Sequence, residues 1–178
     1  MNVRSPLARN GPALSAFAAA VTLAIVFSAP ATIAAPTLEP LVRHGDWLAA
    51  RPSSGDLRGR VVIVDVFTFG CYNCRNVTPN LRALYKAHRG DGLAIVGVHT
   101  PETPYETERA NVVTNLAKQG ITWPVAIDNS HTLWDAFGVQ YWPTQLIFDK
   151  HGTLRKTVVG DSQDAAVDAT VTQLLAEK

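Results

Sequence analysis

Residues 61–74 read Val-Val-Ile-Val-Asp-Val-Phe-Thr-Phe-Gly-Cys-Tyr-Asn-Cys, and this stretch decides the fold. Its first half is apolar on both faces except at Asp65, which is typical of a central β-strand covered on both sides. Its end carries the only two cysteines of the chain, Cys71 and Cys74. A Cys-x-x-Cys pair at the point where a strand gives way to a helix is typical of a thiol–disulfide redox centre. Sulfurs three positions apart share one helix face, so they can close into a reversible disulfide.

Two other uses of the cysteine pair remain open at this point. A structural staple would join distant segments, whereas a loop this short contributes only about 2 kcal/mol on the chain-entropy model, against about 3 for a fifteen-residue loop. A structural zinc ion needs about four ligands, and the chain has no second cysteine pair to supply them. Redox chemistry is therefore favoured over metal binding and over an inert pair.

The first 34 residues are predicted to be a secretory signal peptide. Arg4 and Arg9 form a positively charged start, residues 13–27 are almost unbroken apolar, and residues 32–34 (Thr-Ile-Ala) offer a cleavage signal. The apolar run is shorter than the ~20 residues of a spanning helix, although flanking alanines could extend it into an uncleaved membrane anchor. Either way we expect a periplasmic or otherwise extracytoplasmic domain. In such an oxidising compartment, a pair that acts as a reductant needs a partner that re-reduces it.

Composition limits the partners of the mature chain. Removing residues 1–34 deletes two arginines and no acids, so the formal net charge changes from +1 to −1. This balance gives no electrostatic reason to expect nucleic acid or anionic lipid as a partner. The remaining length fits one domain, and we expect a monomer. Residues 35–60 are predicted to be an N-terminal extension, with room for a short hairpin, and 61–178 the domain itself.

Alternating strand and helix signals predict an α/β fold with a central mixed sheet flanked by helices. The alternation favours a parallel core, and the turn-like residues 149–152 predict an antiparallel hairpin at its edge. Residues 106–119 have helical spacing and would form a helical insertion, while Pro79 should kink the helix after the cysteines. The expected strands are 61–67, 93–98, 125–127, 144–148 and 154–159, and the expected helices are 72–89, 106–119, 130–137 and 162–175.

The two cysteines are expected to have different roles. If the helix begins near Cys71, that sulfur faces unpaired backbone N–H groups and the positive end of the helix dipole, and both favour the thiolate. Cys71 would then attack a substrate disulfide, and the more buried Cys74 would resolve the mixed disulfide by attacking Cys71. Tyr72 and Asn73 bring no positive charge between the sulfurs, so we expect less thiolate stabilisation than in the strongest oxidants.

Asp65 is the second residue with a candidate chemical role. A carboxylate in an apolar strand is costly to bury unless it is protonated, paired or hydrated. Six positions before Cys71, it should lie beneath the redox helix near Cys74. With a raised pKa it could accept the Cys74 proton and return it as a general acid–base. The alternative is a structural aspartate held by a salt bridge or a backbone hydrogen bond.

Residues 64–74 together with Pro79 resemble the active-site segment of the thioredoxin superfamily, in which an acid six residues before the first cysteine and a proline eight after it recur. The helical insertion and the signal segment are similar to the TlpA/ResA-like branch of exported thioredoxins. Residues 97–102 (Gly-Val-His-Thr-Pro-Glu) and 141–143 (Tyr-Trp-Pro) most resemble the thioredoxin-like domain of DipZ-type proteins. The likeness spans roughly Trp47 to the C-terminus. Tyr-Asn replaces thioredoxin's Gly-Pro between the cysteines, which leaves the redox potential and the client range open.

The resemblance implies further features of the site. Pro143 would follow a cis peptide bond and face the cysteines, and the backbone of Trp142 would pair with an extended client segment. Tyr72 and Asn73 would help to shape the docking groove. The family likeness implies no bound cofactor or metal beyond the redox-active disulfide. It also implies client proteins with disulfides or thiols, for example cytochrome c maturation components, and a membrane electron-transfer protein that re-reduces the pair.

The leading interpretation is therefore an exported thiol–disulfide oxidoreductase that reduces client proteins. One rival is a thiol peroxidase of the peroxiredoxin type, because Thr68-x-x-Cys71 matches half of that pattern, although Val64 stands where its proline would be. Another is a non-enzymatic copper chaperone that uses the cysteine pair and a histidine. His99 and His131 are the candidates for that histidine, but each is expected to be a surface or capping residue.

Overall fold

The computed structural model describes residues 1–2 and 35–177, so the expected signal peptide falls almost entirely outside the described residues. Within the described residues, six strands form one mixed sheet in the order β1-β4-β3-β2-β5-β6. Strands β2, β3 and β4 run parallel to one another, and β5 runs antiparallel to β2. The bounds are β1 (Trp47–Leu48), β2 (Val61–Phe67), β3 (Leu93–His99), β4 (Val125–Ile127), β5 (Thr144–Phe148) and β6 (Leu154–Val159).

Strand β2 lies in the middle of the sheet, as its sequence predicted. All seven of its side chains are buried, because helices cover both faces of the sheet. Successive side chains of a strand point to opposite faces. Val61, Ile63 and Phe67 accordingly belong to one core cluster, and the intervening valines belong to the other. Asp65 has the parity of the first set, so this carboxylate points to the same face as Phe67.

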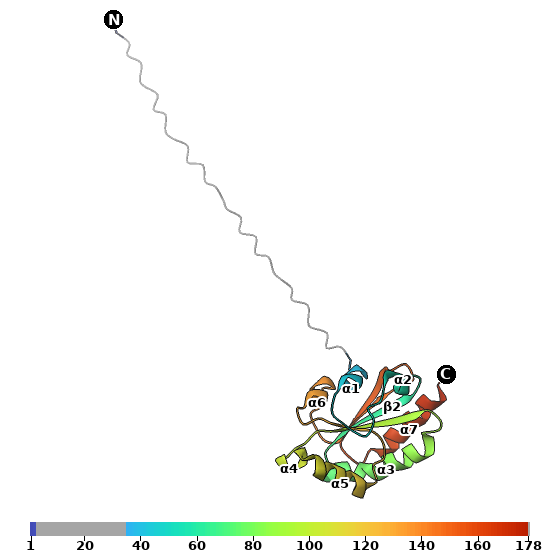
Figure 1. Ribbon diagram of the computed structural model, residues 1–178. Helices are drawn as coiled ribbons and strands as arrows, with labels where there is room; N and C mark the ends of the chain where they lie inside the picture. Colours follow the sequence, from blue (N-terminus) through green and yellow to red (C-terminus); the bar gives the residue numbers. More distant parts are fainter. Residues whose placement is uncertain (3–34, 178) are drawn as a thin grey trace. The chain divides into compact units, whose positions relative to one another are not determined.

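The helices form two layers around the sheet (Figure 1). Side chains of α3, α5 and α7 build the core on the Phe67 face, and side chains of α1, α2 and α6 build the core on the opposite face. The bounds are α1 (Glu39–Arg43), α2 (Ser54–Leu57), α3 (Tyr72–His88), α4 (Pro104–Thr107), α5 (Arg109–Gln119), α6 (Thr132–Ala136) and α7 (Asp164–Ala176).

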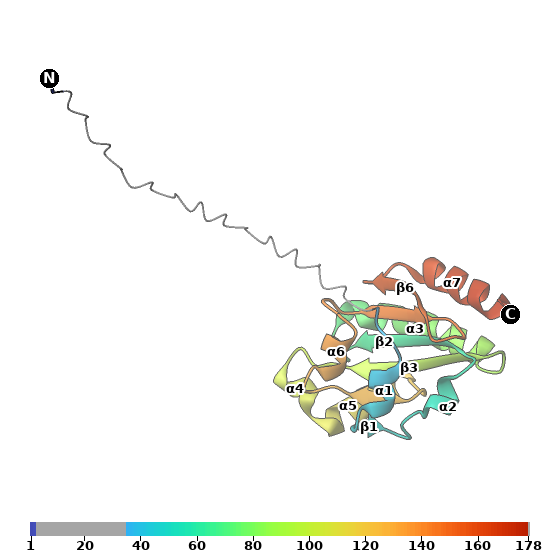
Figure 2. The ribbon, with the colours of Figure 1, turned by 90° about the horizontal axis from the view of Figure 1, so that it is seen from above.

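The expected antiparallel hairpin is present as β5 and β6, and β6 forms one edge of the sheet next to α7 (Figure 2). The other edge is β1, which pairs antiparallel with β4. The N-terminal extension therefore completes the domain's own sheet and forms no hairpin within itself. Trp47 explains this pairing, because its buried ring joins the core of the α1 face while its backbone lies opposite Ala126.

Helix α3 carries the cysteines and begins one residue after Cys71, which is its N-cap. Pro79 lies inside the helix, as the sequence predicted, and the helix runs from Tyr72 to His88. Its buried face follows helical spacing through Cys74, Val77, Thr78, Leu81 and Leu84. This apolar face fixes the orientation of the helix on the sheet and thereby the position of both sulfurs.

The insertion between β3 and β4 is two helices, whereas the sequence predicted one from 106 to 119. Glu108 has extended backbone angles (φ −74°, ψ 112°) and separates α4 from α5. Helix α4 starts with a capping box between Thr103 and Glu106, with Pro104 in its first turn. Helix α5 ends, as expected, at Gly120, whose φ of +66° is a conformation that glycine adopts readily. No helix within residues 1–2 and 35–177 has the length and apolarity to cross a membrane.

Candidate active site

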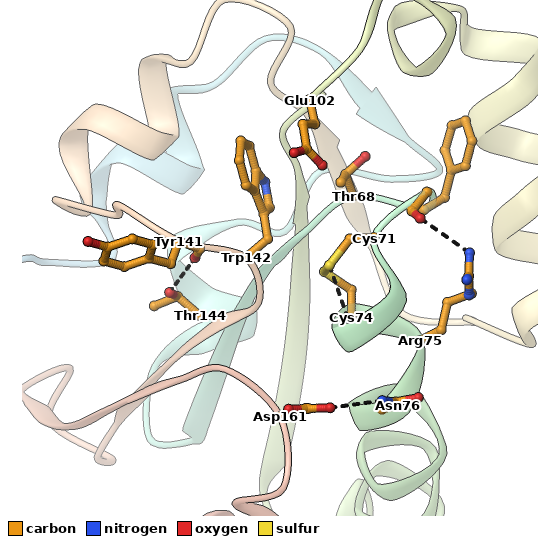
Figure 3. The surroundings of a disulfide bond; sticks show 12 residues. Thr68, Cys71, Cys74, Arg75, Asn76, Glu102, Tyr141, Trp142, Thr144 and Asp161 are labelled. Atoms are coloured by element: carbon orange, nitrogen blue, oxygen red, sulfur yellow. Dashed lines mark hydrogen bonds between the residues drawn. A yellow bond between two sulfur atoms is a disulfide. The ribbon is translucent and has the colours of Figure 1, made fainter.

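The cysteine pair sits at the start of α3 as a disulfide, with its Cα atoms 5.3 Å apart (Figure 3). Cys71 is the N-cap residue, and its sulfur accepts a hydrogen bond from the Cys74 backbone N–H at 3.1 Å. Cys71 is partly exposed, whereas Cys74 is 2% exposed and packs into the core. The geometry thus makes Cys71 the accessible sulfur and gives it the N–H donor and helix-dipole end that stabilise a thiolate.

The two residues between the cysteines are exposed and contribute no charge. The Tyr72 side chain is 69% exposed, and Asn73 is also exposed. The nearest cation along α3 is Arg75, whose guanidinium donates to the Gly70 carbonyl at 3.2 Å and lies 5.9 Å from the centre of the Tyr72 ring. Arg75 therefore borders the redox turn from the solvent side.

A second loop faces the disulfide across the surface of the domain. The peptide bond between Trp142 and Pro143 is cis, as the resemblance implied. The Trp142 indole donates from Nε1 to the Thr100 carbonyl at 3.0 Å, and its ring packs 4.3 Å from that of Trp134. Tyr141 is 64% exposed on the same loop (Figure 3). The partly exposed Trp142 ring lies on the side of this loop nearer to the disulfide, with Tyr141 beyond it (Figure 3). Such amphipathic rings suit contact with a polypeptide.

Buried Asp128 supports the positions of the Trp134 and Trp142 rings through hydrogen bonds. Its carboxylate accepts hydrogen bonds from the backbone N–H groups of Leu133 (3.0 Å) and Trp134 (2.9 Å) at the start of α6, and from the Thr100 hydroxyl (3.0 Å). Thr100 is also the residue whose carbonyl binds Trp142. One carboxylate thus fixes both the helix that carries Trp134 and the strand end that anchors Trp142.

Asp65 is buried in β2, and its parity along the strand places it on the face of the sheet that α3 covers. It is 2% exposed, and its Oδ1 accepts a hydrogen bond from Gln145 Nε2 at 3.3 Å across the β2–β5 pair. Burial raises the pKa of Asp65 to about 7, and the Gln145 hydrogen bond only partly opposes this. It shares the Phe67 face of β2, where Cys74 packs. A carboxyl group that is near half-protonated at neutral pH can take up a proton and return it.

His99 is buried, contrary to the sequence expectation that it lies on the surface or caps a helix. Its ring is fully buried, stacks on Phe69 at 5.4 Å and meets Phe67 edge-on at 5.6 Å. Its Nε2 hydrogen bonds the Thr68 hydroxyl at 3.3 Å, while Nδ1 has no partner among the described residues. Burial lowers the pKa of His99 to about 4 even though Glu106 opposes the change, so the ring is neutral at pH 7. His131, as expected, precedes a helix as its N-cap residue.

Glu106 is the residue near the site that sequence reasoning missed. It is 3% exposed, and its Oε1 accepts a hydrogen bond from the backbone N–H of Gly70, directly before Cys71, at 3.0 Å. Its Oε2 accepts from the backbone N–H groups of Glu102 and Thr103, each at 2.8 Å. Desolvation opposes ionisation, but hydrogen bonds from Thr68, Glu102 and Thr103 outweigh it, so the pKa of Glu106 lies below its ordinary value.

The described residues hold no group of three or more His, Cys, Asp and Glu side chains placed to bind a metal ion. The copper-chaperone alternative needs a histidine next to the cysteine pair, yet His99 is enclosed by two phenylalanine rings. A hollow of about 610 Å³ lies along α3 beside Arg82 and Lys86, and neither cysteine lines it. Cys71 is partly exposed and Tyr72 and Asn73 are exposed, so a macromolecular substrate can reach the disulfide.

Comparison with known proteins agrees with this geometry. Protein DipZ of Mycobacterium tuberculosis is 37% identical over 119 residues, which cover 67% of this chain and 17% of that protein. The chain thus spans about a sixth of the length of that relative. Thiol-disulfide oxidoreductase YkuV of Bacillus subtilis is 28% identical over 74% of this chain and 88% of its own.

Solved structures show the same architecture. A thioredoxin-like protein in its oxidised form superposes with a TM-score of 0.72 at 26% identity, and the match covers 81% of this chain and 97% of that one. The expected thioredoxin-like α/β fold and the resemblance to DipZ-type domains are therefore confirmed. The model of the AhpC/TSA family matches residues 37–157, a range that includes both cysteines, Glu106 and the cis-proline loop. With about two thirds of its length matched, this chain belongs to the AhpC/TSA family.

Proposed function

We propose that the protein is a thiol–disulfide oxidoreductase that reduces disulfides in client proteins through Cys71 and Cys74. The observation that carries the proposal is the placement of Cys71, partly exposed at the N-cap of α3, next to a cysteine that is 2% exposed. An attacking thiol must be accessible and ionised, and a resolving thiol needs only to reach its neighbour. The YkuV and DipZ likenesses support the same chemistry.

The reaction balances in two exchanges. The Cys71 thiolate attacks one sulfur of the client disulfide, forms a mixed disulfide and releases the other client sulfur as a thiolate. Cys74 then loses its proton and attacks the Cys71 sulfur, which closes the protein's disulfide and releases the second client thiolate. Two electrons pass to the client, and Asp65, with its pKa of about 7, accepts the Cys74 proton.

Client binding is assigned to the surface around the disulfide. Tyr72, Asn73 and Trp142 are the proposed contacts, and the backbone at Trp142-Pro143 pairs with an extended client segment. The sequence supports two further proposals. Residues 1–34 direct the protein to an extracytoplasmic location, and a membrane electron-transfer protein re-reduces the cysteine pair. An apolar leader and a pair that must be reduced in an oxidising compartment support this arrangement.

Trapping of mixed disulfides tests the assignment. A Cys74→Ser variant should accumulate covalent adducts with disulfide-containing proteins, because the resolving attack is lost, and the adducts should disappear on treatment with a dithiol reductant. A Cys71→Ser variant is the matched control and should form none. If adducts collect on Cys74 in the Cys71→Ser variant, or if Cys74→Ser forms none, the proposed roles are wrong.

The peroxidase alternative is tested with the same protein. The match to the AhpC/TSA family is compatible with a peroxidase. However, Thr68, the threonine of the peroxiredoxin-like pattern, is fully buried and hydrogen bonds His99. The reduced wild-type protein should reduce a protein disulfide much faster than it consumes hydrogen peroxide. A faster peroxide reaction that is lost in Cys71→Ser would favour the peroxidase instead.

A further inference from the structure

Glu106 joins the helical insertion to the loop that carries the attacking cysteine. Glu106 and Gly70 are far apart in sequence, yet Glu106 Oε1 accepts a hydrogen bond from the Gly70 N–H at 3.0 Å. The other carboxylate oxygen, Oε2, takes part in the capping box at the start of α4. The contact is tight, because a Cβ atom built on Gly70 would collide with Oε1. A glycine at this position therefore allows the carboxylate to approach the backbone next to Cys71.

The charge of this carboxylate is not neutralised by a neighbouring cation. Within residues 35–177 no Lys, Arg or His forms a salt bridge with Glu106. The neighbouring His99 is neutral at pH 7, since burial lowers its pKa to about 4. Arg75 donates to the Gly70 carbonyl instead and is exposed to solvent, which weakens its effect.

Two other acids are relevant to the electrostatics of the redox pair. Glu102 is exposed above the disulfide (Figure 3) and gives its N–H to Glu106. Asp65 lies in the core on the side where Cys74 packs. Glu106 differs from both, because it hydrogen bonds the backbone N–H of Gly70, the residue directly before Cys71.

We propose that Glu106 is a positioning residue for the redox pair: it holds the loop before Cys71 through Gly70, and its fixed negative charge disfavours the Cys71 thiolate. The effect opposes the stabilisation from the start of α3. A less stable thiolate means a less stable reduced form, so the equilibrium moves towards the disulfide and the pair becomes a stronger reductant. This inference rests on the proposed function and supplies a structural reason for its reductive direction.

The size of the effect follows from Coulomb's law. A unit charge that is separated from the Cys71 sulfur by the hydrogen-bonded Gly70 backbone, in an effective dielectric of about 20 and partly screened by solvent, changes the ionisation constant of Cys71 by about tenfold. If Cys71 is a thiolate at the working pH, the dithiol–disulfide equilibrium changes by up to the same factor, which corresponds to about 30 mV.

The test compares two glutamates of the same insertion. Glu106→Gln removes the buried charge, and Glu108→Gln removes an exposed charge two residues away as the matched control. The pKa of Cys71 is read from the ultraviolet absorbance of its thiolate in a Cys74→Ser background, and the intact pair is equilibrated with glutathione. Glu106→Gln should lower the pKa of Cys71 by about one and shift the pair up to tenfold towards the dithiol. An unchanged or raised pKa, or an equal fall in Glu108→Gln, would overturn the proposal.

A second variant tests the same contact by changing Gly70, in case Glu106→Gln does not fold. Gly70→Ala should displace the Glu106 carboxylate and, like Glu106→Gln, lower the pKa of Cys71. In a Glu106→Ala background the added methyl group meets no carboxylate, so Gly70→Ala should cost less stability there than in the wild type. Equal costs in both backgrounds, or a Gly70→Ala variant with unchanged thiol pKa, would refute the contact.

The two hypotheses fail in different ways. If the wild-type pair does not exchange with glutathione or with protein disulfides, the proposed function fails, while the pKa of Cys71 can still be compared among the variants. If the wild-type pair cycles and Glu106→Gln leaves both the thiol pKa and the equilibrium unchanged, the role of Glu106 fails and the oxidoreductase stands.

Discussion

Replacing Asp65 with Asn should stabilise the folded protein, and the gain should grow as the pH rises. Asp65 is 2% exposed in the centre of β2, and Gln145 is its hydrogen-bond partner. Burial raises its pKa to about 7. Asparagine has a similar shape and never carries the charge, so the variant avoids the cost of burying a carboxylate.

The magnitude follows from the two pKa values. The folded value is about 7, and the value in an unfolded chain is about 3.9. A difference of about three, at 1.36 kcal/mol per pKa unit, amounts to roughly 4 kcal/mol. Because the folded pKa is the higher one, the wild type has this stability in full below about pH 3.9 and loses it as the pH rises through about 7. Asp65→Asn loses nothing over that window.

Urea unfolding of the oxidised proteins measures the effect. The difference in unfolding free energy between Asp65→Asn and the wild type should grow by up to roughly 4 kcal/mol between about pH 4 and about pH 8. Groups common to both proteins cancel in this difference. Thr157→Ser on the exposed side of β6 removes no titrating group and should give a flat difference. A flat difference for Asp65→Asn as well would refute the raised pKa and the proton-transfer role built on it.

Three further outcomes are expected. Asp65→Asn should slow resolution of the mixed disulfide near neutral pH by roughly 10² or more, because general acid–base transfer is lost; stopped-flow exchange with an unchanged rate would leave Asp65 a structural residue. Trp134→Ala should weaken reduction of a protein disulfide more than reduction of a small disulfide, since the support of Trp142 is lost; equal losses would contradict this. Ile147 is fully buried in β5, so Ile147→Ala should cost about 2–5 kcal/mol in unfolding free energy. Val159→Ala at the exposed edge should cost much less. Similar costs for both variants would show that burial does not determine the loss of stability.

Local signals predicted the centre of the fold well. Three element boundaries could be predicted because each depends on residues that are close together in sequence. They are the bounds of the strand at 61–67, the start of the helix after the cysteine pair, and the end of the helix before Gly120. The buried position of Asp65 was also readable, because a single acid in an apolar strand has no exposed face to occupy. The roles assigned to the cysteines and to Asp65 stay predictions until the variants are measured.

The support behind the cysteines depended on contacts that sequence spacing does not show. Glu106 lies 36 residues after Gly70. It was expected only as the first residue of a helix over 106–119, and that placement does not indicate a contact with the loop before Cys71. A readable signal existed in Thr103-Pro104-x-Glu106, since a capping box with proline at the first helical position predicts a separate short helix. His99 was misplaced for a similar reason: a histidine at a strand end is buried only because Phe67 and Phe69 enclose it.

The two borders of the sheet bear on how this molecule meets other polypeptides. Strand β1 is two residues long, and β6 carries Arg155 and Lys156. Short or charged outer strands discourage a foreign chain from adding to a sheet and seeding an aggregate. Neither border therefore invites backbone association, which leaves the cis-proline loop and the sulfur of Cys71 as the places where an incoming chain can attach.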